Sequence, residues 1–150
     1  MANRLAFFVA TGFGVGLVPF APGTFGSLLG IPLYALAVFP LAESIPATLT
    51  IVAGLVAASC WVAGIADRSF PEHDNGKIVI DEVAGMLLAL VWHPPTLLNV
   101  ATLFLLFRFF DVVKVWPANR IDRRLGGGAG VVLDDLVSGI YANLAGRLLL

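Results

Sequence analysis

Several acidic residues of this chain lie in or beside long apolar segments, where a membrane protein rarely keeps a charge that has no functional role. They occur at the edge of, or inside, long apolar segments, and they are Asp81, Glu82, Asp111, Asp134 and Asp135. A carboxylate at membrane depth costs about 2.5–3.5 kcal/mol on insertion scales and therefore marks a candidate functional site. Arg108 and Lys114 lie nearby in the sequence. We therefore predict a cation site beside an anion site, an arrangement suited to phosphate chemistry at a membrane surface.

The spacing of these residues supports both parts of the prediction. On a helix, adjacent Asp81 and Glu82 lie about 100° apart and can address one ion from a shared rim, and nearby Gly85 allows another helix to approach closely. A three-residue spacing places Arg108, Asp111 and Lys114 on one helix face. The structural alternatives are an acidic helix N-terminus and an intrahelical ladder of ion pairs. Burial at a bilayer rim weakens the second alternative, because burying charge costs more than the pairing returns.

A polar segment at 21–27, Ala-Pro-Gly-Thr-Phe-Gly-Ser, interrupts a charge-free part of the chain. We expect a turn whose N–H groups, together with the hydroxyls of Thr24 and Ser27, face an anion at a helix N-terminus. The alternative is a helix start with Thr24 or Ser27 as its N-cap. The glycine-rich segment 12–16 lacks a preceding strand and the spacing of a dinucleotide-binding loop, so it is interpreted as a close helix crossing.

The composition indicates that these residues belong to a membrane-embedded helical protein. Hydrophobic residues make up 59% of the chain and charged residues 13%, and the mean hydropathy is +0.93. Segments 44–66 and 83–107 carry no charge and have the length needed to span a hydrocarbon core of about 30 Å. The alternative is a soluble bundle with a very apolar core, but soluble helices rarely stay uncharged around their full circumference. The chain is short enough to form one domain, residues 1–150.

The net charge excludes one class of partner. The formal net charge is −1 and the pI is about 6.0, so no basic face is available to neutralise the phosphates of a nucleic acid. The lone Cys60 cannot form an intramolecular disulfide and is interpreted as a packing residue. We expect contacts with the membrane and with an anionic phospholipid, and no obligate protein partner.

The elements that position the charged residues are predicted to be helices, because the apolar stretches do not alternate with period two. We expect an all-α compact bundle of about four to five membrane-embedded helices, with a short N-terminal helix or re-entrant segment. Segment 83–107 is predicted to form a hairpin that turns at 93–95, His-Pro-Pro, which puts the charged blocks 67–82 and 108–135 on one side. The basic run at 120–124 places that side in the cytoplasm.

Three further helices are predicted from the remaining apolar segments, at 27–39, 46–66 and 133–150. The first of these is short for a span, and we expect it to tilt or to rest at the interface. The glycine-rich segment 126–130 is expected to form a loop that leads into the final helix. The charged residues should then collect at helix ends on one side of the membrane.

Three blocks of this sequence resemble the phosphatidylglycerophosphatase A enzymes of bacterial membranes. The first block joins 12–16 to 21–27, and the second is 73–85, His-Asp-Asn-Gly-Lys-Ile-Val-Ile-Asp-Glu-Val-Ala-Gly. The third block runs from 107 to 135 and includes Phe107-Arg108-Phe109-Phe110-Asp111, Lys114, Trp116-Pro117, Asp122-Arg123, Gly127-Gly128-Ala129-Gly130 and Asp134-Asp135. The blocks follow the family order and span most of the chain. The family usually has proline after the lysine where this chain has Val115, so we expect a shift in the helix end and no loss of chemistry.

The resemblance implies Mg²⁺-dependent removal of the terminal phosphate from phosphatidylglycerophosphate, which yields phosphatidylglycerol. It also implies a multi-pass protein of the bacterial cytoplasmic (inner) membrane with its active site facing the cytoplasm. On this hypothesis the metal ligands and the general base are Asp81, Glu82, Asp111, Asp134 and Asp135. The phosphoryl oxygens would be held by Thr24, Ser27, Arg108, Lys114 and Arg123. A water nucleophile is the simplest chemistry, and an aspartyl-phosphate intermediate is the alternative.

Proteins of other classes also use acidic residues in membranes. The non-enzyme alternative is a small membrane cation transporter or channel component, which predicts charges near mid-membrane on facing helices. A lipid phosphotransferase of the CDP-alcohol type would need an Asp-Gly…Ala-Arg…Gly…Asp…Asp spacing, which is absent. The histidine-nucleophile membrane phosphatases are excluded because His73 and His93 lack the matching Arg and Ser-Gly-His context.

Overall fold

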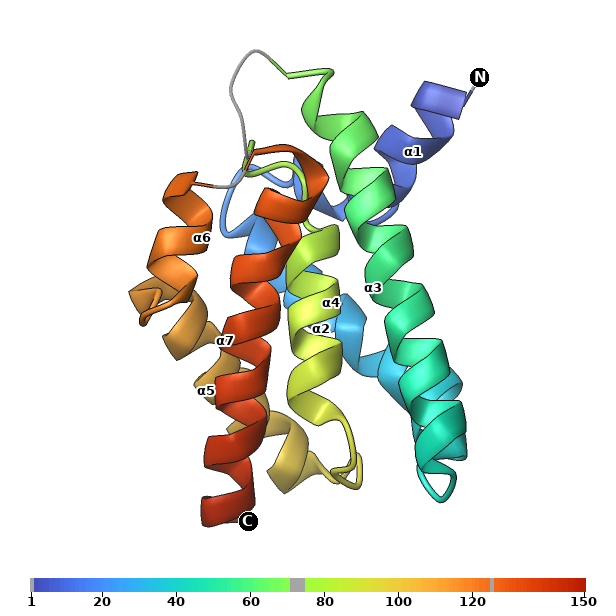
Figure 1. Ribbon diagram of the computed structural model, residues 1–150, viewed down its shortest axis with the longest axis vertical. Helices are drawn as coiled ribbons and strands as arrows, with labels where there is room; N and C mark the ends of the chain where they lie inside the picture. Colours follow the sequence, from blue (N-terminus) through green and yellow to red (C-terminus); the bar gives the residue numbers. More distant parts are fainter. Residues whose placement is uncertain (1, 71–74, 125) are drawn as a thin grey trace.

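The computed structural model of this chain is a bundle of helices (Figure 1). It describes residues 2–70, 75–124 and 126–150, with side chains for all of these except 2, 3 and 122–124. Within these ranges the helices follow one another without a strand. The predicted all-α fold is therefore confirmed.

The described ranges contain seven α-helices and three shorter helical segments. The α-helices are α1 (Ala2–Ala10), α2 (Pro22–Leu33), α3 (Ile45–Asp67), α4 (Ile80–Leu90), α5 (Leu97–Val113), α6 (Ala118–Arg124) and α7 (Gly127–Leu149). The shorter segments are the 3-10 helix η1 (Val15–Leu17), the π-helix η2 (Tyr34–Val38) and the 3-10 helix η3 (Phe39–Leu41). Because η2 and η3 continue from α2, the chain stays helical from Pro22 to Leu41.

Helix α4 is the centre of the bundle and packs against α2, α3, α5 and α7. Most of its residues are buried, and its side chains Met86 and Leu90 join Leu103 and Phe107 of α5 in the main hydrophobic core. At 1.5 Å per residue α4 is about 16 Å long, roughly half the thickness of a hydrocarbon core. It is therefore a core helix, around which the longer helices are arranged.

The helix segments that carry the predicted site residues lie toward one end of the bundle, the upper end in Figure 1. Helices α2, α4 and α7 begin at this end, and α3 and α5 finish there. The chain between α4 and α5 turns at the opposite end, which confirms the predicted hairpin. Arg147, near the C-terminus, lies at that opposite end, where its guanidinium is 6.0 Å from the ring centre of Trp92 in the chain between α4 and α5. We call the upper end the polar end.

The outer faces of the bundle are apolar. Two helical stretches, Pro22–Leu41 and Ile45–Asp67, are long and apolar enough to cross a membrane. Large aliphatic side chains point out of the bundle, including Leu36, which is 80% exposed, and Leu105, which is 67% exposed. Exposed apolar surface of this kind is typical of contact with lipid, and it is unfavourable in water. The bundle therefore has the surface of a membrane protein.

Helix α2 begins earlier than the sequence analysis predicted. It starts at Pro22, five residues before position 27, because proline has no N–H to leave unpaired at the first helical position. Segment 21–27 is therefore the first two turns of a helix, and the predicted turn is wrong. Ala21 occupies the N-cap position with φ 46°, so neither Thr24 nor Ser27 is the N-cap. The added residues also make this helical stretch long enough to span.

Helix α7 also begins earlier than predicted, because the glycine-rich segment 126–130 is not a loop. The helix starts at Gly127, and Gly128 packs directly on α3. A Cβ atom at position 128 would overlap the carbonyl oxygen of Cys60 and the backbone of Gly64, so only glycine permits this approach. As a result Asp134 and Asp135 lie about two turns inside α7. The prediction that they collect at a helix end is wrong.

Residues 12–14 of the glycine-rich segment connect α1 to η1 as a turn, and residues 15 and 16 begin η1, which corrects the interpretation of segment 12–16 as a helix crossing. Gly12, Phe13 and Gly14 have φ values of 56°, 59° and 94°, and this left-handed backbone reverses the chain direction. Gly16 then packs so closely on Lys77 that a Cβ atom would overlap the lysine carbonyl oxygen. The turn therefore holds the residues just before α4.

Replacing Gly128 by alanine is expected to destabilise the protein by about 1–3 kcal/mol, because the new methyl group would force α7 away from α3. Thermal unfolding of the detergent-purified protein measures this change. Gly54→Ala is the matched control, since no atom lies within 4 Å of a Cβ atom at that α3 position. The control should be neutral or slightly stabilising. Equal stability of the two variants would contradict a close crossing at Gly128.

Candidate functional site

Three carboxylates from two helices meet at the polar end of the bundle. Asp81 and Glu82 lie in the first turn of α4, and Asp135 comes from α7. Each offers one carboxylate oxygen, and these three oxygens all lie within 4.8 Å of one another. Asp81 and Asp135 are buried, and Glu82 is partly buried. Like charges this close and this poorly solvated require a cation or protons among them. We call Asp81, Glu82 and Asp135 the carboxylate cluster.

Glycines bring the helices of the cluster into contact. A Cβ atom at Gly85 of α4 would lie 2.8 Å from the carbonyl oxygen of Asp135, and one at Gly139 of α7 would overlap the carbonyl oxygen of Gly85. The two backbones therefore touch, so residues one turn away on each helix lie side by side. This confirms the prediction that Gly85 admits a neighbouring helix.

Helix α2 closes the other side of the cluster. Gly23 lies directly against the carboxylate of Glu82, and a Cβ atom there would overlap Oε1. The side chain of Glu82 is therefore seated against the first turn of α2. The sequence analysis missed this role of Gly23, although a glycine in the opening turn of an apolar helix is a recognisable sign of a close approach.

The carboxylate cluster has the chemistry of a site for a hard divalent cation. Its donors are all carboxylate oxygens, which Mg²⁺ and Ca²⁺ prefer. Oε2 of Glu82 is buried, and no hydrogen-bond partner for it lies in the described part of the chain. A buried ionised oxygen without a partner is costly, and a metal ion is one group that would satisfy it. The residues present therefore fit a metal ion.

Two basic side chains lie beside the cluster, each paired with an aspartate. Nη1 of Arg108 lies 2.6 Å from Oδ2 of Asp111, one turn along α5. Nζ of Lys114 lies 2.7 Å from Oδ2 of Asp134 on α7. A Cβ atom at Gly23 would meet both Nη1 of Arg108 and the carboxylate of Glu82, so these two side chains lie close together. The basic groups therefore border the carboxylates at the polar end, where the charge of a phosphate would be balanced.

Lys114 reaches this position in a different way from the one the spacing predicted. Helix α5 ends at Val113, and Lys114 follows in a left-handed conformation with φ 46°. The three-residue spacing therefore places only Arg108 and Asp111 on one helix face. The position of the lysine is decided by the helix end and by its partner Asp134.

The predicted site residues separate into groups in the structure. Asp81, Glu82 and Asp135 form the cluster, whereas Asp111 and Asp134 are paired with basic side chains. Ser27 is fully buried and accepts a hydrogen bond from Arg108, and Thr24 is partly buried one turn earlier on α2. The side chain of Arg123 and all of His73 and Asp74 lie outside the described residues.

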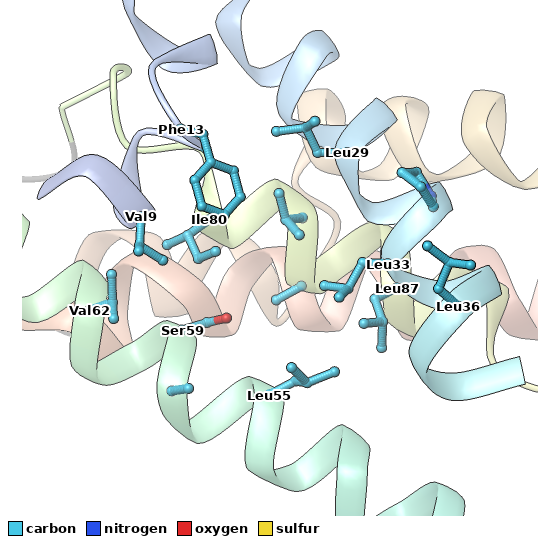
Figure 2. Close-up of a pocket in the computed structure, with 15 residues that line it drawn as sticks. Val9, Phe13, Leu29, Leu33, Leu36, Leu55, Ser59, Val62, Ile80 and Leu87 are labelled. Atoms are coloured by element: carbon cyan, nitrogen blue, oxygen red, sulfur yellow. The ribbon is translucent and has the colours of Figure 1, made fainter. Parts of the chain in front are cut away.

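An apolar groove lies on the opposite face of α4 (Figure 2). Its volume is about 480 Å³, and α1, α2, α3 and α4 line it with side chains that include Phe13, Leu33, Leu55, Ile80 and Leu87. Ser59 is the polar side chain on its wall. The groove is separated from the carboxylate cluster by the packing of α2 on α4, where Gly26 contacts Val79 and Gly30 contacts Met86. The groove is therefore an apolar surface separate from the carboxylate cluster.

Comparison with known proteins identifies the family. A family model described as phosphatidylglycerophosphatase A matches residues 8–150. The chain belongs to this family of phosphatases. Its relatives include proteins named phosphatidylglycerophosphatase A from Escherichia coli K12 and Haemophilus influenzae, each 36% identical over 135 residues. The matched region covers 89% of this chain and 77% and 82% of those two proteins.

A third relative carries a different name. A protein of Bacteroides thetaiotaomicron, provisionally named a phosphatidylinositol-3-phosphatase, is 35% identical over 141 residues, which cover 89% of this chain and 86% of that protein. No solved structure matches the chain. The resemblance seen in the sequence is confirmed, and family membership favours the enzyme over the cation transporter.

Replacing Gly23 by alanine is expected to reduce phosphatase activity roughly 10- to 100-fold, because the new methyl group would displace the carboxylate of Glu82. Phosphate release and thermal unfolding should be measured on the same preparations. Gly76→Ala is the matched control at the polar end, since nothing lies within 4 Å of a Cβ atom there. Full activity of the Gly23 variant would show that the seat for Glu82 is not needed.

Proposed function

We propose that this chain is a Mg²⁺-dependent phosphatidylglycerophosphatase that releases phosphate from phosphatidylglycerophosphate and forms phosphatidylglycerol in phospholipid biosynthesis. The observation that carries the proposal is the carboxylate cluster bordered by Arg108 and Lys114, in a chain of this family. Cation ligands and phosphate-binding groups are thereby close together at one end of an apolar bundle. That combination suits a lipid whose phosphate lies at the membrane surface.

In this proposal the metal ion is held by Asp81, Glu82 and Asp135, whose oxygens already converge. When bound, Mg²⁺ supplies positive charge that polarises the phosphoryl group and stabilises the charge developing on its oxygens. Asp111 and Asp134 lie next to this cluster and hold the basic side chains that border it. Their role is thus closer to positioning than the sequence analysis predicted for them.

The remaining chemistry belongs to the side chains around the cluster. Arg108 and Lys114 bind the phosphoryl oxygens, the first through a planar fork and the second as a point charge. A carboxylate of the cluster would accept a proton from the water as the water oxygen bonds to phosphorus. It would return that proton to the glycerol oxygen as the bond between that oxygen and phosphorus breaks. The alternative is attack by an aspartate carboxylate, which would leave labelled phosphate on the protein after an acid quench.

The site would face the cytoplasm of a bacterial inner membrane. Helix α6, whose backbone carries the basic run at 120–124, lies toward the polar end of the bundle (Figure 1). An excess of basic residues is typical of the cytoplasmic side of membrane proteins. The lipid substrate then reaches the site from the cytoplasmic leaflet, along the apolar outer surface of the bundle.

The proposed activity predicts phosphate release from phosphatidylglycerophosphate by detergent-purified protein with Mg²⁺, and none with EDTA. Asp81→Asn and Glu82→Gln should each lower the rate by about 100-fold or more, because both remove a ligand charge. Glu43→Gln is the matched control, since Glu43 is an exposed carboxylate beside Trp92 and Pro94, at the end opposite the polar end. It should keep the activity of the unmodified protein.

The identity of the substrate is tested by comparing phosphate release from phosphatidylglycerophosphate and from phosphatidylinositol 3-phosphate in the same assay. The name of the third relative suggests the second lipid. We expect faster release from phosphatidylglycerophosphate. Faster release from the inositol lipid would replace the proposed substrate while leaving the phosphatase site in place. Cation flux into proteoliposomes without any phosphate release would instead favour the transporter.

The proposed orientation predicts a pattern of cysteine labelling in spheroplasts. In a Cys60→Ser background, Glu43→Cys at the end opposite the site should react with a membrane-impermeant maleimide. Gly76→Cys at the polar end should react only after the membrane is disrupted, because that end faces the cytoplasm. Both positions are exposed, so burial does not limit either reaction. The reverse pattern would place the site on the outside.

A further inference from the structure

We propose that Ser27 is a positioning residue that orients Arg108 and does not itself bind the substrate phosphate. This inference rests on the proposed function, because it concerns how the phosphate-binding arginine is held. It changes the role that the sequence suggested for the hydroxyl, and it gives the start of α2 a specific task in the site.

The hydroxyl hydrogen of Ser27 is already committed within α2. Its Oγ donates to the carbonyl oxygen of Gly23, one turn earlier, at 2.8 Å. A serine hydroxyl has one hydrogen to donate, and the oxygens of an ionised phosphate are acceptors. Ser27 is also 0% exposed. The hydroxyl therefore offers a phosphate neither a donor nor an accessible surface.

The oxygen of the same hydroxyl holds the arginine. Nη1 of Arg108 donates to Oγ of Ser27 at 3.3 Å, and the same nitrogen lies 2.6 Å from Oδ2 of Asp111. Nη1 carries two hydrogens, so one can be directed to each partner. The arginine is thereby fixed between a residue of α2 and a residue of its own helix, α5.

Fixing Nη1 through two partners sets the plane of the whole guanidinium group, because that group is rigid and planar. The described part of the chain gives no acceptor for Nη2 or Nε of Arg108, which leaves that edge for phosphoryl oxygens. The side chain of Arg108 is 23% exposed, so part of it is open to a ligand. If Ser27 lost its hydroxyl, Asp111 alone would hold Nη1 and the plane would no longer be defined.

The small residues of α2 make this arrangement possible. A Cβ atom at Gly23 would lie 3.3 Å from Nη1 of Arg108 and would overlap the carboxylate of Glu82. Gly23 and Ser27 therefore form a surface on α2 against which both side chains rest. The first two turns of α2 position the phosphate-binding arginine and the metal-binding glutamate relative to each other.

A double-mutant cycle on phosphate release tests the role of Ser27. Ser27→Ala should lower kcat roughly 10- to 100-fold with a smaller change in KM, because a misaligned arginine mainly fails in the transition state. In an Arg108→Ala background, Ser27→Ala should cause no further loss, since the group that it orients is gone. Losses that multiply in the double variant would show that Ser27 contacts the phosphate directly, and would overturn the proposal.

Ser138→Ala is the matched control for a structural effect. Ser138 is also buried, and its Oγ donates to the carbonyl oxygen four residues earlier at 3.0 Å, but no arginine donates to it in the described part of the chain. Its replacement should lower thermal stability as much as Ser27→Ala does, with kcat unchanged. A similar loss of kcat in both variants would assign the Ser27 effect to stability alone.

A measurement that does not depend on activity separates this inference from the proposed function. In protein labelled with ¹⁵N-arginine, the two Nη groups of Arg108 should give distinct NMR signals, because the two partners of Nη1 restrict its rotation. The signals are assigned by their loss in Arg108→Lys. They should average in Ser27→Ala and stay distinct in Ser138→Ala. If the unmodified protein releases no phosphate, the proposed function fails, and unchanged signals in Ser27→Ala would overturn the positioning role.

Discussion

The contact between the backbones of α4 and α7 is the constraint on which the site depends. Gly85 and Gly139 allow these helices to touch, and the touching point lies one turn from the acidic residues of both. Asp81 and Asp135 therefore lie side by side although they are far apart in the sequence. A side chain larger than hydrogen at either glycine would separate the helices, and the carboxylates would no longer converge. The contact that packs α4 against α7 therefore also brings the acidic residues of the site together.

The two basic side chains of the site form ion pairs with two of its acidic residues. The acidic residues of the site therefore differ in the charges that surround them. Arg108 and Lys114 each engage one aspartate, Asp111 and Asp134. The three carboxylates of the cluster lie beside these two pairs, and the basic groups stay at the border. In a medium of low dielectric such a division favours binding of a cation at the cluster and of an anion beside it. A phosphate ester with its metal ion would match both halves.

The beginning of α2 shows how a short segment can serve fold and site together. Pro22 starts the helix at a point where it can lie against α4 and α5. Gly23 then accommodates Glu82, and Ser27 meets Arg108. The segment is therefore helical and is not the predicted turn. Its surface contacts the side chains of Glu82 and Arg108. The apolar groove on the other face of α4 remains separate, because the same α2–α4 packing divides the two regions.

The sequence by itself determined the helical class and the hairpin at 93–95, and it singled out the acidic and basic residues from which the candidate site is built. These follow from local properties: apolar stretches without alternation, prolines at a turn, and charges that are costly in a membrane. Only the tertiary structure decided which carboxylates lie close together, which are paired with Arg108 and Lys114, and that segment 126–130 is helical. Those outcomes depend on how closely two helices approach. That distance is set by glycines meeting a backbone from a distant part of the chain, which sequence spacing does not encode.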